Sequence, residues 1–350
     1  MDTAVEFVTD INDWYWYAVI ALLVGSGLYY SFRSRFIQLR LIPDMLRSIV
    51  EKPEELPDGE KGISAFRAFS ISAASRVGTG NIAGVAIAIS IGGPGALFWM
   101  WAMALIGAST AFVESTLAQL YKVRDKGAFR GGPAYYMQYG LGKRWMGMIF
   151  AVIITITYGF VFNAVQTNSI VDAVSSSVGE KTTGLQVGIG IGVAILVALV
   201  IFGGVRRISS VSQVVVPIMA IAYLIIGIIV VVLNISEVPG LFKLVFENAF
   251  GIREVAGGGF GAAFMYGIRR GLFSNEAGMG SVPNAGATAS VSHPVKQGLV
   301  QSLGVYFDTW LVCSITGFII LLSEPEFGSG LEGAALTQNA MALQLGDWTV

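Results

Sequence analysis

The chain has 350 residues, of which 54% are hydrophobic and only 13% are charged, and its formal net charge is −1. Soluble globular chains carry roughly 25% charged residues, so this composition, with a mean hydropathy of +0.67, predicts a polytopic membrane protein. The near-zero charge and the lack of a basic tract give no indication of nucleic-acid binding. A single cysteine and a single histidine exclude a disulfide framework and a zinc site built from these residues.

About eight stretches are long and apolar enough to cross a bilayer as helices. Because they lack the alternation over about ten residues that is typical of barrel strands, we predict an all-α protein. Two amphipathic segments, 38–50 and 239–251, are expected to form helices that lie either on lipid or on the protein's own surface. In chain order, the expected spans are 14–32, 65–91, 94–121, 146–172, 185–203, 211–235, 257–288 and 297–322.

The charges of the loops predict an orientation in the membrane. The loops after the first, third and fifth spans are rich in lysine and arginine, and the alternate loops contain almost none. The positive-inside rule therefore places the N-terminus outside. That N-terminus lacks the basic start of a cleavable signal peptide, so we expect it in the mature protein. The final segment, "LTQNAMALQLGDWTV", is expected not to complete a helix.

Two of the expected spans contain residues that interrupt a helix. The span 65–91 holds Gly78, Thr79 and Gly80, and the span 257–288 holds a cluster of glycines with polar residues at 274–276. Each glycine costs roughly 1 kcal/mol of helix propensity. Close packing of helices through small residues explains a single such span equally well. The two spans, however, stand five apart with opposite direction, which is typical of inverted-repeat transporters whose broken helices face each other.

A break of this kind has a chemical use. Unwinding frees carbonyl groups, which are hard oxygen ligands for Na⁺, and a half-helix N-terminus attracts a carboxylate. Lipid cannot satisfy these groups, so the break must face protein or a cavity. One pair of broken helices can thus hold a sodium ion and an amino-acid zwitterion together, and no other cofactor is expected.

Three motifs in order carry a resemblance to a known family. "SAASRVGTGNIAGVA", "GGPAYYM" and "RGLFSNEAGMGSVPNAGA" resemble the alanine/glycine:cation symporter family, also called the sodium:alanine symporter family. The resemblance implies a leucine-transporter-like inverted-repeat fold with one extra N-terminal helix. It implies an N-terminal helix and cytoplasmic amphipathic segment at 1–64, a first five-helix repeat at 65–235 and the start of the second repeat at 236–350. With roughly eleven helices in the family, about three would follow Val350.

The resemblance also implies site residues. The first break would bind the substrate at Gly78, Thr79 and Gly80, with the amides of Thr79 and Gly80 meeting its carboxylate. The second break would surround the amino group and side chain, and two backbone carbonyls would bind Na⁺ with further ligands beyond residue 350. The residues of the second break are Phe273, Ser274 and Asn275, and the two carbonyls belong to Ala74 and Val77.

The match to the leucine transporter is inexact at Arg76 and Glu276, where that protein has small or neutral residues. This difference argues against a second sodium site that uses the substrate carboxylate, so one Na⁺ per substrate is expected. From its own spacing, Gln166 is a further candidate, because Tyr158, Phe162 and Gln166 recur every four residues on one helix face. Such residues could line the site or only form hydrogen bonds between helices.

Several ionisable residues fall inside the expected spans, where they are rare and usually paired. A structural ion pair facing the bundle interior is somewhat more common for such residues than direct ligand contact. We predict that Arg76 and Glu276 pair across the repeats and help close the inner gate. Asp308 or Glu114 is expected to neutralise Arg269 or its neighbour Arg270 on the outer side. The complete set is Arg76, Glu114, Arg269, Arg270, Glu276 and Asp308.

The function predicted is secondary active transport that couples Na⁺ entry to uptake of alanine or glycine by alternating access; these two amino acids come from the resemblance alone. A proton-coupled symporter of the same fold, with Glu276 as the proton carrier, remains an alternative, and a channel is a more distant one. No HExxH, GxSxG or GxxxxGK[ST] motif occurs, so an enzyme is not expected. The expected location is the prokaryotic plasma (inner) membrane, crossed several times, and a monomer is compatible with the sequence.

Overall fold

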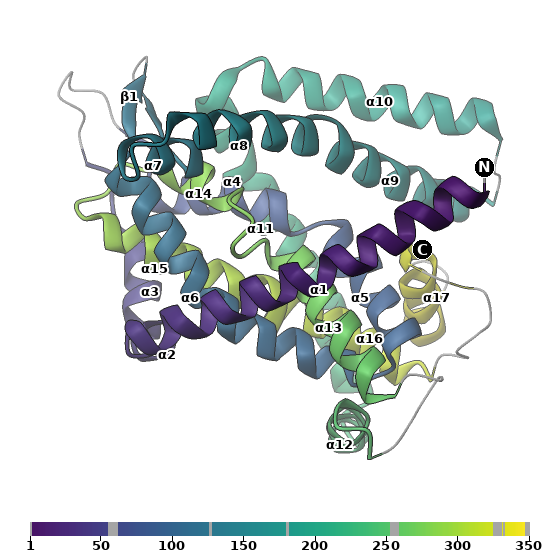
Figure 1. Cartoon of the computed structure of the whole chain (residues 1–350). Coiled ribbons are helices and arrows are strands. Elements are labelled where there is room, and N and C mark those ends of the chain that lie inside the picture. Colours follow the sequence, from purple (N-terminus) through teal and green to yellow (C-terminus); the bar gives the residue numbers. More distant parts are fainter. Residues whose placement is uncertain are drawn as a thin grey trace.

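The computed structural model describes residues 2–54, 62–125, 128–179, 182–252, 259–324, 331 and 333–346, and the statements below concern these residues. They form helices and one small hairpin (Figure 1). The first part comprises α1 (Asp2–Arg33), α2 (Ile37–Arg40), α3 (Ile42–Ile49), α4 (Ala65–Arg76), α5 (Thr79–Gly92), α6 (Ala96–Leu120), the antiparallel strands β1 (Val123–Asp125) and β2 (Ala128–Arg130), α7 (Pro133–Tyr139), α8 (Arg144–Ile156), η1 (Thr157–Val161) and α9 (Phe162–Val178). The second part comprises α10 (Thr183–Ile201), α11 (Gly204–Leu233), α12 (Val238–Ala249), α13 (Phe260–Asn275), α14 (Val282–Ala287), α15 (Pro294–Val305), η2 (Tyr306–Cys313), α16 (Ser314–Leu322) and α17 (Gly333–Leu345).

The structure confirms a polytopic membrane protein. Among the described residues, six continuous helices are long and apolar enough to span a bilayer, and a seventh candidate is the pair α4 and α5, bent by 41° at its break. The remaining expected span, 257–288, is α13 followed by a break and α14; α13 has 16 residues, fewer than the roughly 20 that a straight span needs. The six helices are Glu6–Arg33, Ala96–Leu120, Arg144–Val178, Thr183–Ile201, Gly204–Leu233 and Pro294–Leu322.

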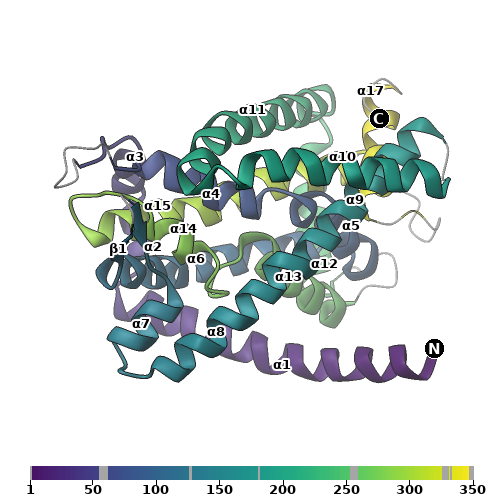
Figure 2. The same ribbon diagram turned by 90° about the horizontal axis from the view of Figure 1, so that it is seen from above.

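Helix α6 lies at the centre of the bundle, where it packs against α1, α13 and α15. Its residues Leu97 and Met100 are fully buried, together with Ile89 of α5 and Ile319 of α16. In contrast, the most apolar 18-residue stretches of Arg144–Val178 and of α10 contain no buried residue. This exposure is expected for helices that face acyl chains. Figures 1 and 2 show α8, α9 and α10 running together along one side of the bundle, away from α6.

Two local predictions need correction. Residues 336–345 of the final segment belong to the helix α17, which packs against α5 and α16 and buries Leu336 and Ala340, and residues 347–350 lie outside the described residues. The basic residues after the fifth span lie in the first turn of α11 and not in a loop, because α11 begins at Gly204. Both amphipathic segments form helices on the protein's own surface. Part of each apolar face packs against the bundle, since Met45 of α3 and Val245 of α12 are fully buried, whereas Leu46, Val50 and Phe246 are exposed.

Two of the spans also contain π-helical turns, which the sequence did not predict. One is η1, between α8 and α9, and the other is η2, between α15 and α16. A π-turn shifts the backbone hydrogen bonds by one residue and often marks a functional site. The turn η2 packs against α5 and α13, the helices that begin and end at the two breaks.

Candidate functional site

The first break separates α4 from α5. Arg76 ends α4, Val77 and Gly78 are extended, and Thr79 begins α5. The side chain of Asn81 caps the new helix, because its Oδ1 accepts a hydrogen bond from the Gly78 N–H at 2.9 Å. The chain thus changes direction within two residues, and the N-terminus of α5 is directed toward the interior of the bundle.

The side chain of Gln166 lies against this break. Its Oε1 accepts a hydrogen bond from the Thr79 N–H at 3.3 Å, and a Cβ atom on Gly78 would come within 2.8 Å of its Nε2. The structure therefore brings together three of the predicted site residues, which are Gly78, Thr79 and Gln166. The Thr79 hydroxyl is buried and has no hydrogen-bond partner within the described part of the chain.

The second break is longer and differently built. Helix α13 ends at Asn275, and Glu276, Gly278 and Gly280 adopt left-handed conformations with φ of 54°, 83° and 79° before α14 begins. The side chain of Asn275 accepts from the Ala277 N–H at 3.0 Å. Two serines donate to the Glu276 carboxylate, Ser75 of α4 at 2.8 Å and Ser281 at 2.5 Å. Glu114 of α6 accepts a hydrogen bond from the Gly278 N–H at 3.1 Å.

The two breaks meet in a buried polar cluster that η2 completes. Asn81 Nδ2 donates to Ser274 Oγ at 3.0 Å and to Asp308 Oδ1 at 2.6 Å. Ser274 Oγ donates to Asp308 Oδ2 at 2.8 Å, and all three side chains are buried. A Cβ atom on Gly80 would lie 3.2 Å from Ser274 Cα, so a larger residue there would require the two segments to move apart by a few tenths of an ångström. We call Asn81, Ser274, Asp308 and Thr309 the junction cluster.

An aromatic stack connects α9 with the second break. The rings of Tyr158 and Phe162 are parallel with centroids 4.6 Å apart, and those of Phe162 and Phe273 are nearly parallel at 5.4 Å. The residues predicted from their spacing to share one face, Tyr158, Phe162 and Gln166, thus all face the breaks. The predicted Na⁺ ligand Val77 borders a cavity of about 80 Å³ shared with Gly78 and Asn81.

The predicted ion pairs are wrong for this structure. Arg76 NH1 donates to the Gln301 carbonyl at 3.3 Å and forms no ion pair with Glu276 among the described residues, whereas Ser75 and Ser281 donate to the Glu276 carboxylate. Arg269 pairs with Asp13 of α1 at 2.7 Å and not with Asp308 or Glu114. The partner of Arg269 thus comes from α1, 256 positions earlier in the sequence.

The sequence reasoning placed Asp308 only among the charged residues and did not single out Asn81 or Thr309. A signal was present for Asn81, which directly follows the glycines of the first break. A buried amide inside a span requires hydrogen-bond partners, and these lie on α13 and η2. The partners come from segments more than 190 residues away, so the cluster could not be assembled from spacing.

The family model of the sodium:alanine symporter family matches residues 1–350. The chain is 51% identical to the amino-acid carrier protein AlsT of Bacillus subtilis over 338 residues, which cover 96% of this chain and 70% of that protein. The chain belongs to the sodium:alanine symporter family. It shares 49% identity with the probable sodium/glutamine symporter GlnT of B. subtilis (99% and 72% of the two chains) and 38% with the sodium/alanine symporter AgcS of Methanococcus maripaludis (95% and 74%).

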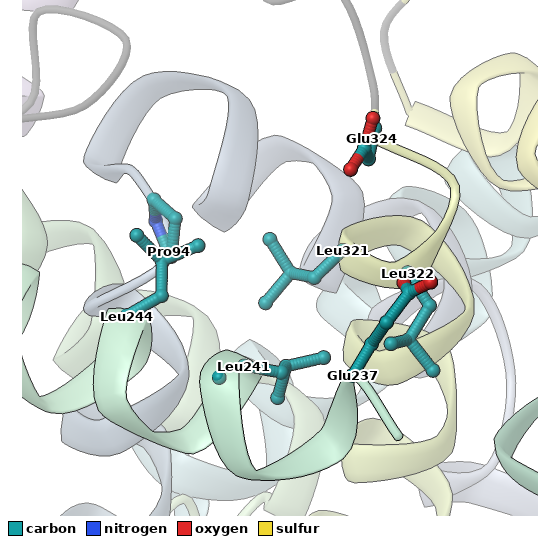
Figure 3. Close-up of a pocket in the computed structure, with 8 residues that line it drawn as sticks. Pro94, Glu237, Leu241, Leu244, Leu321, Leu322 and Glu324 are labelled. Atoms are coloured by element: carbon teal, nitrogen blue, oxygen red, sulfur yellow. The ribbon is translucent and has the colours of Figure 1, made fainter. Parts of the chain in front are cut away.

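Membership in the sodium:alanine symporter family supports Na⁺-coupled amino-acid transport by a multi-pass membrane protein. The relatives are named as carriers and symporters, in agreement with the expectation that the chain is not an enzyme. Within this family member, a cavity of about 410 Å³ lies apart from the breaks (Figure 3). Leu241, Leu244 and Leu321 line it, and Glu237 and Glu324 lie at its edge. None of its lining residues belongs to the predicted site.

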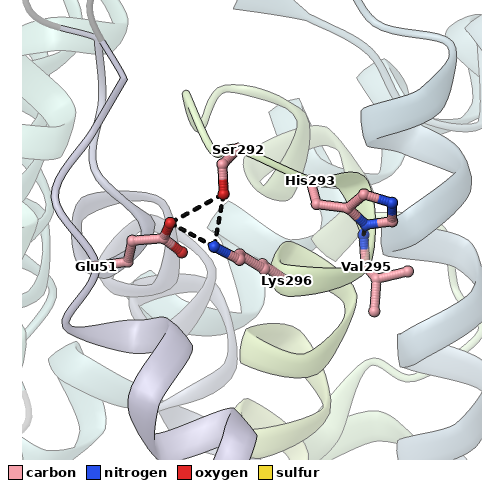
Figure 4. A network of polar contacts seen from close by, with 5 residues as sticks. All are labelled: Glu51, Ser292, His293, Val295 and Lys296. Carbon is pink, nitrogen blue, oxygen red and sulfur yellow. Dashed lines mark hydrogen bonds and ion pairs between the residues drawn. The ribbon is translucent and has the colours of Figure 1, made fainter.

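Residues 51, 54 and 63, which precede α4, are connected to the loop after α14 by hydrogen bonds and one ion pair. Ile63 accepts a hydrogen bond from the Ser290 N–H at 2.8 Å, and Glu54 and Ser290 exchange two hydrogen bonds at 3.2 and 3.0 Å. Glu51 forms an ion pair with Lys296 at 2.5 Å and accepts from Ser292 (Figure 4). These contacts therefore connect the segment before α4, which leads to the first break, with the segment that follows the second break.

Proposed function

We propose that the protein couples Na⁺ entry to uptake of a small neutral amino acid, alanine or glycine, by alternating access in a leucine-transporter-like inverted-repeat fold. The observation that carries the proposal is the contact between two antiparallel helix breaks at a buried polar cluster. Two breaks in this relation are typical of carriers, whereas a channel would need one re-entrant loop per subunit in a ring.

The substrate carboxylate would bind at the start of α5. The amides of Thr79 and Gly80 stand at a helix N-terminus, which carries partial positive charge. In the structure, the Thr79 amide donates to the oxygen of Gln166, so this oxygen occupies the place of a carboxylate oxygen. When the substrate arrives, Gln166 would turn away from the amide and offer its NH₂ group to the same carboxylate.

The amino group and side chain would face the end of α13. The C-terminus of a helix carries partial negative charge and attracts an ammonium group, and Phe273, Ser274 and Asn275 form this end. The stack of Phe162 on Phe273 and the close approach of Gly80 to Ser274 leave little room beside the amino acid. This crowding supports a small side chain, although one relative is named for glutamine.

Na⁺ would bind the carbonyls of Ala74 and Val77 at the end of α4, with no further cofactor. A proton-coupled symporter remains the second candidate, because Glu276 is a buried carboxylate at the break and one relative at 44% identity is named a putative sodium/proton-dependent alanine carrier. We propose a plasma-membrane location with the N-terminus outside, and a monomer.

Alanine uptake into proteoliposomes tests the proposal, with Na⁺ replaced by choline at a fixed pH. We expect uptake to require Na⁺, to saturate and to be inhibited by glycine more strongly than by glutamine. Undiminished uptake in choline would exclude sodium coupling. Uptake that glutamine inhibits most strongly would instead contradict the small side chain.

A further inference from the structure

We propose that a cavity between the β1–β2 hairpin and the start of α11 binds the phosphate group of an anionic membrane phospholipid. The cavity has a volume of about 620 Å³, and pockets that hold small ligands typically have about 300–1,000 Å³. None of its lining residues belongs to the predicted substrate or Na⁺ positions. The inference goes beyond the proposed function, because it requires only that the chain spans a membrane.

The charges of the lining fit a phosphodiester. Arg130 and Arg206 are basic and Asp125 is acidic, so these described residues give the lining a net charge of +1. A phosphodiester carries a single negative charge. Arg130 Nε forms an ion pair with Asp125 Oδ2 at 2.5 Å, which leaves the two NH₂ groups of this guanidinium to donate to an anion. The planar fork of an arginine matches the geometry of phosphate oxygens.

The position of Arg206 also indicates an anion. Arg206 and Arg207 lie in the first turn of α11, which contains no acidic residue, and the side chain of Arg207 packs closely over Gly203 at the edge of the cavity. A helix N-terminus carries partial positive charge, so basic residues are unfavourable there. The positive-inside rule accounts for arginines on this side of the membrane but not for their place at a helix start. A bound phosphate would compensate both arginines and the helix terminus.

The remaining polar lining connects the cavity with the second break. Asn284 of α14 and Thr288, directly after α14, line the cavity together with Tyr135 of α7. Asn284 Nδ2 donates to the Gly280 carbonyl of the second break at 2.9 Å. The hydroxyl groups of Tyr135 and Thr288 are suited to the oxygens of a headgroup. A lipid bound here would therefore hold α14 against the hairpin and α11.

The apolar surface beside the cavity favours a lipid over free phosphate. Helix α10 ends at Ile201, two residues before Gly203, and its most apolar stretch contains no buried residue. Phe202, between them, is 90% exposed. A phospholipid with its phosphate in the cavity can thus place its acyl chains along α10, whereas free phosphate would use the charges alone. Basic pockets at the membrane interface are typical sites for anionic headgroups.

Native mass spectrometry of the protein released from nanodiscs tests this site. The nanodiscs contain equal parts of phosphatidylglycerol, which is anionic, and phosphatidylethanolamine, whose ammonium group cancels the phosphate charge. We expect the unchanged protein to retain phosphatidylglycerol in several-fold excess. Arg206→Gln should lower this retention roughly tenfold, as expected for the loss of a charge-assisted hydrogen bond, and Arg206→Lys should lower it less. The matched control is Arg144→Gln, because Arg144 is exposed and does not line the cavity.

Equal retention of the two lipids by the unchanged protein would overturn the proposal, and this comparison does not depend on the folding of any variant. Unchanged retention of phosphatidylglycerol by monodisperse Arg206→Gln would also overturn it, as would an equal loss in Arg144→Gln. Inorganic phosphate distinguishes the two sources of the anion. We expect the lipid to stay bound in millimolar phosphate, and its displacement by micromolar phosphate would exclude a lipid site. Uptake of amino acid enters none of these measurements, so their failure would leave the proposed function intact.

Discussion

The two breaks are related in position but differ in construction. The first consists of two residues between α4 and α5, and a single amide side chain from α9 covers it. The second runs from 276 to 281 and contains three residues with left-handed backbone. Side chains from α4 and α6 hold it in place. The first break is therefore a short interruption that the Gln166 side chain covers, whereas the second is a longer segment that hydrogen bonds from two neighbouring helices hold in place.

This difference predicts different consequences of substitution. A change in the second break should affect folding first, because strain and close packing are concentrated there. A change around the first break should affect substrate affinity first, since its contacts are made by the flexible end of Gln166. The predictions below follow this distinction from the largest expected effect to the smallest.

The largest effect is expected for Gly280→Ala in the second break. Its φ is 79°, and a Cβ atom would lie 2.8 Å from Pro133 Cγ and 2.9 Å from the ring of Phe150. The left-handed backbone and the overpacking together should lower the free energy of unfolding by about 2–4 kcal/mol. The yield of monodisperse protein and its thermal unfolding in detergent measure this loss.

The control for this prediction is Gly142→Ala. Gly142 has a similar φ of 68°, but nothing lies within 4 Å of its Cβ position. This variant should lose only the backbone contribution of about 1–2 kcal/mol. Equal stability of the two variants would show that packing around the second break is looser than the structure indicates.

The second prediction concerns Gln166→Glu at the first break. The new carboxylate would accept the hydrogen bond of the Thr79 amide and compete with the carboxylate of the substrate. A hydrogen bond to a charged group contributes about 1.5–3 kcal/mol, so KM for alanine should rise roughly 10–100-fold while folding is retained. Asn163→Asp is the matched control, because Asn163 lies on the same helix with its side chain exposed. A similar KM in both variants would contradict a carboxylate site at Thr79.

The third prediction compares two charge swaps, one of Arg269 with Asp13 and one of Arg76 with Glu276. A swap of charges between Arg269 and Asp13 should restore part of the function that each single change loses, because the two form an ion pair at 2.7 Å. The swap of Arg76 with Glu276 should restore nothing, since these residues have separate partners. Uptake rates of the singles and doubles give the coupling energies, expected above about 0.5 kcal/mol for the first pair and below it for the second. A larger coupling energy for Arg76 with Glu276 than for Arg269 with Asp13 would support the pairing predicted from the sequence.

The sequence predicted the fold features that depend on local composition. Apolar length identified the spans, and the glycines at 78, 80, 278 and 280 located both breaks. What it could not predict was which residues meet across the bundle. Asp308 and Asn81 are separated by 227 positions, and the partner of Arg269 lies on α1. The helix α17 was missed because its mixed polar and apolar pattern is explained only by its contacts with α5 and α16.

The smallest expected effect is a pH dependence of the free energy of unfolding that arises from Lys122. This residue contacts the segment after α14. Its ammonium donates to the Ala289 carbonyl and to Gln119, each at 2.7 Å. Burial lowers the pKa of Lys122 to about 8, against a smaller opposing effect of Glu54. In the unfolded chain a lysine titrates near 10.4. Between these two values the unfolded state binds more protons than the folded state, so the contribution of Lys122 to the free energy of unfolding rises with pH.

The comparison of Lys122 with Lys122→Met isolates this contribution. The difference in Tm between the unchanged protein and the variant should shift in favour of the unchanged protein as the pH rises from 8 to 10. Neutral Lys122 still donates to the Ala289 carbonyl, so this contact with the segment after α14 persists while the cost of burying the charge disappears. A difference in Tm that stays constant or narrows over this range would mean that the Lys122 ammonium is solvated. The segment after α14 that contains Ala289 would then be open to water.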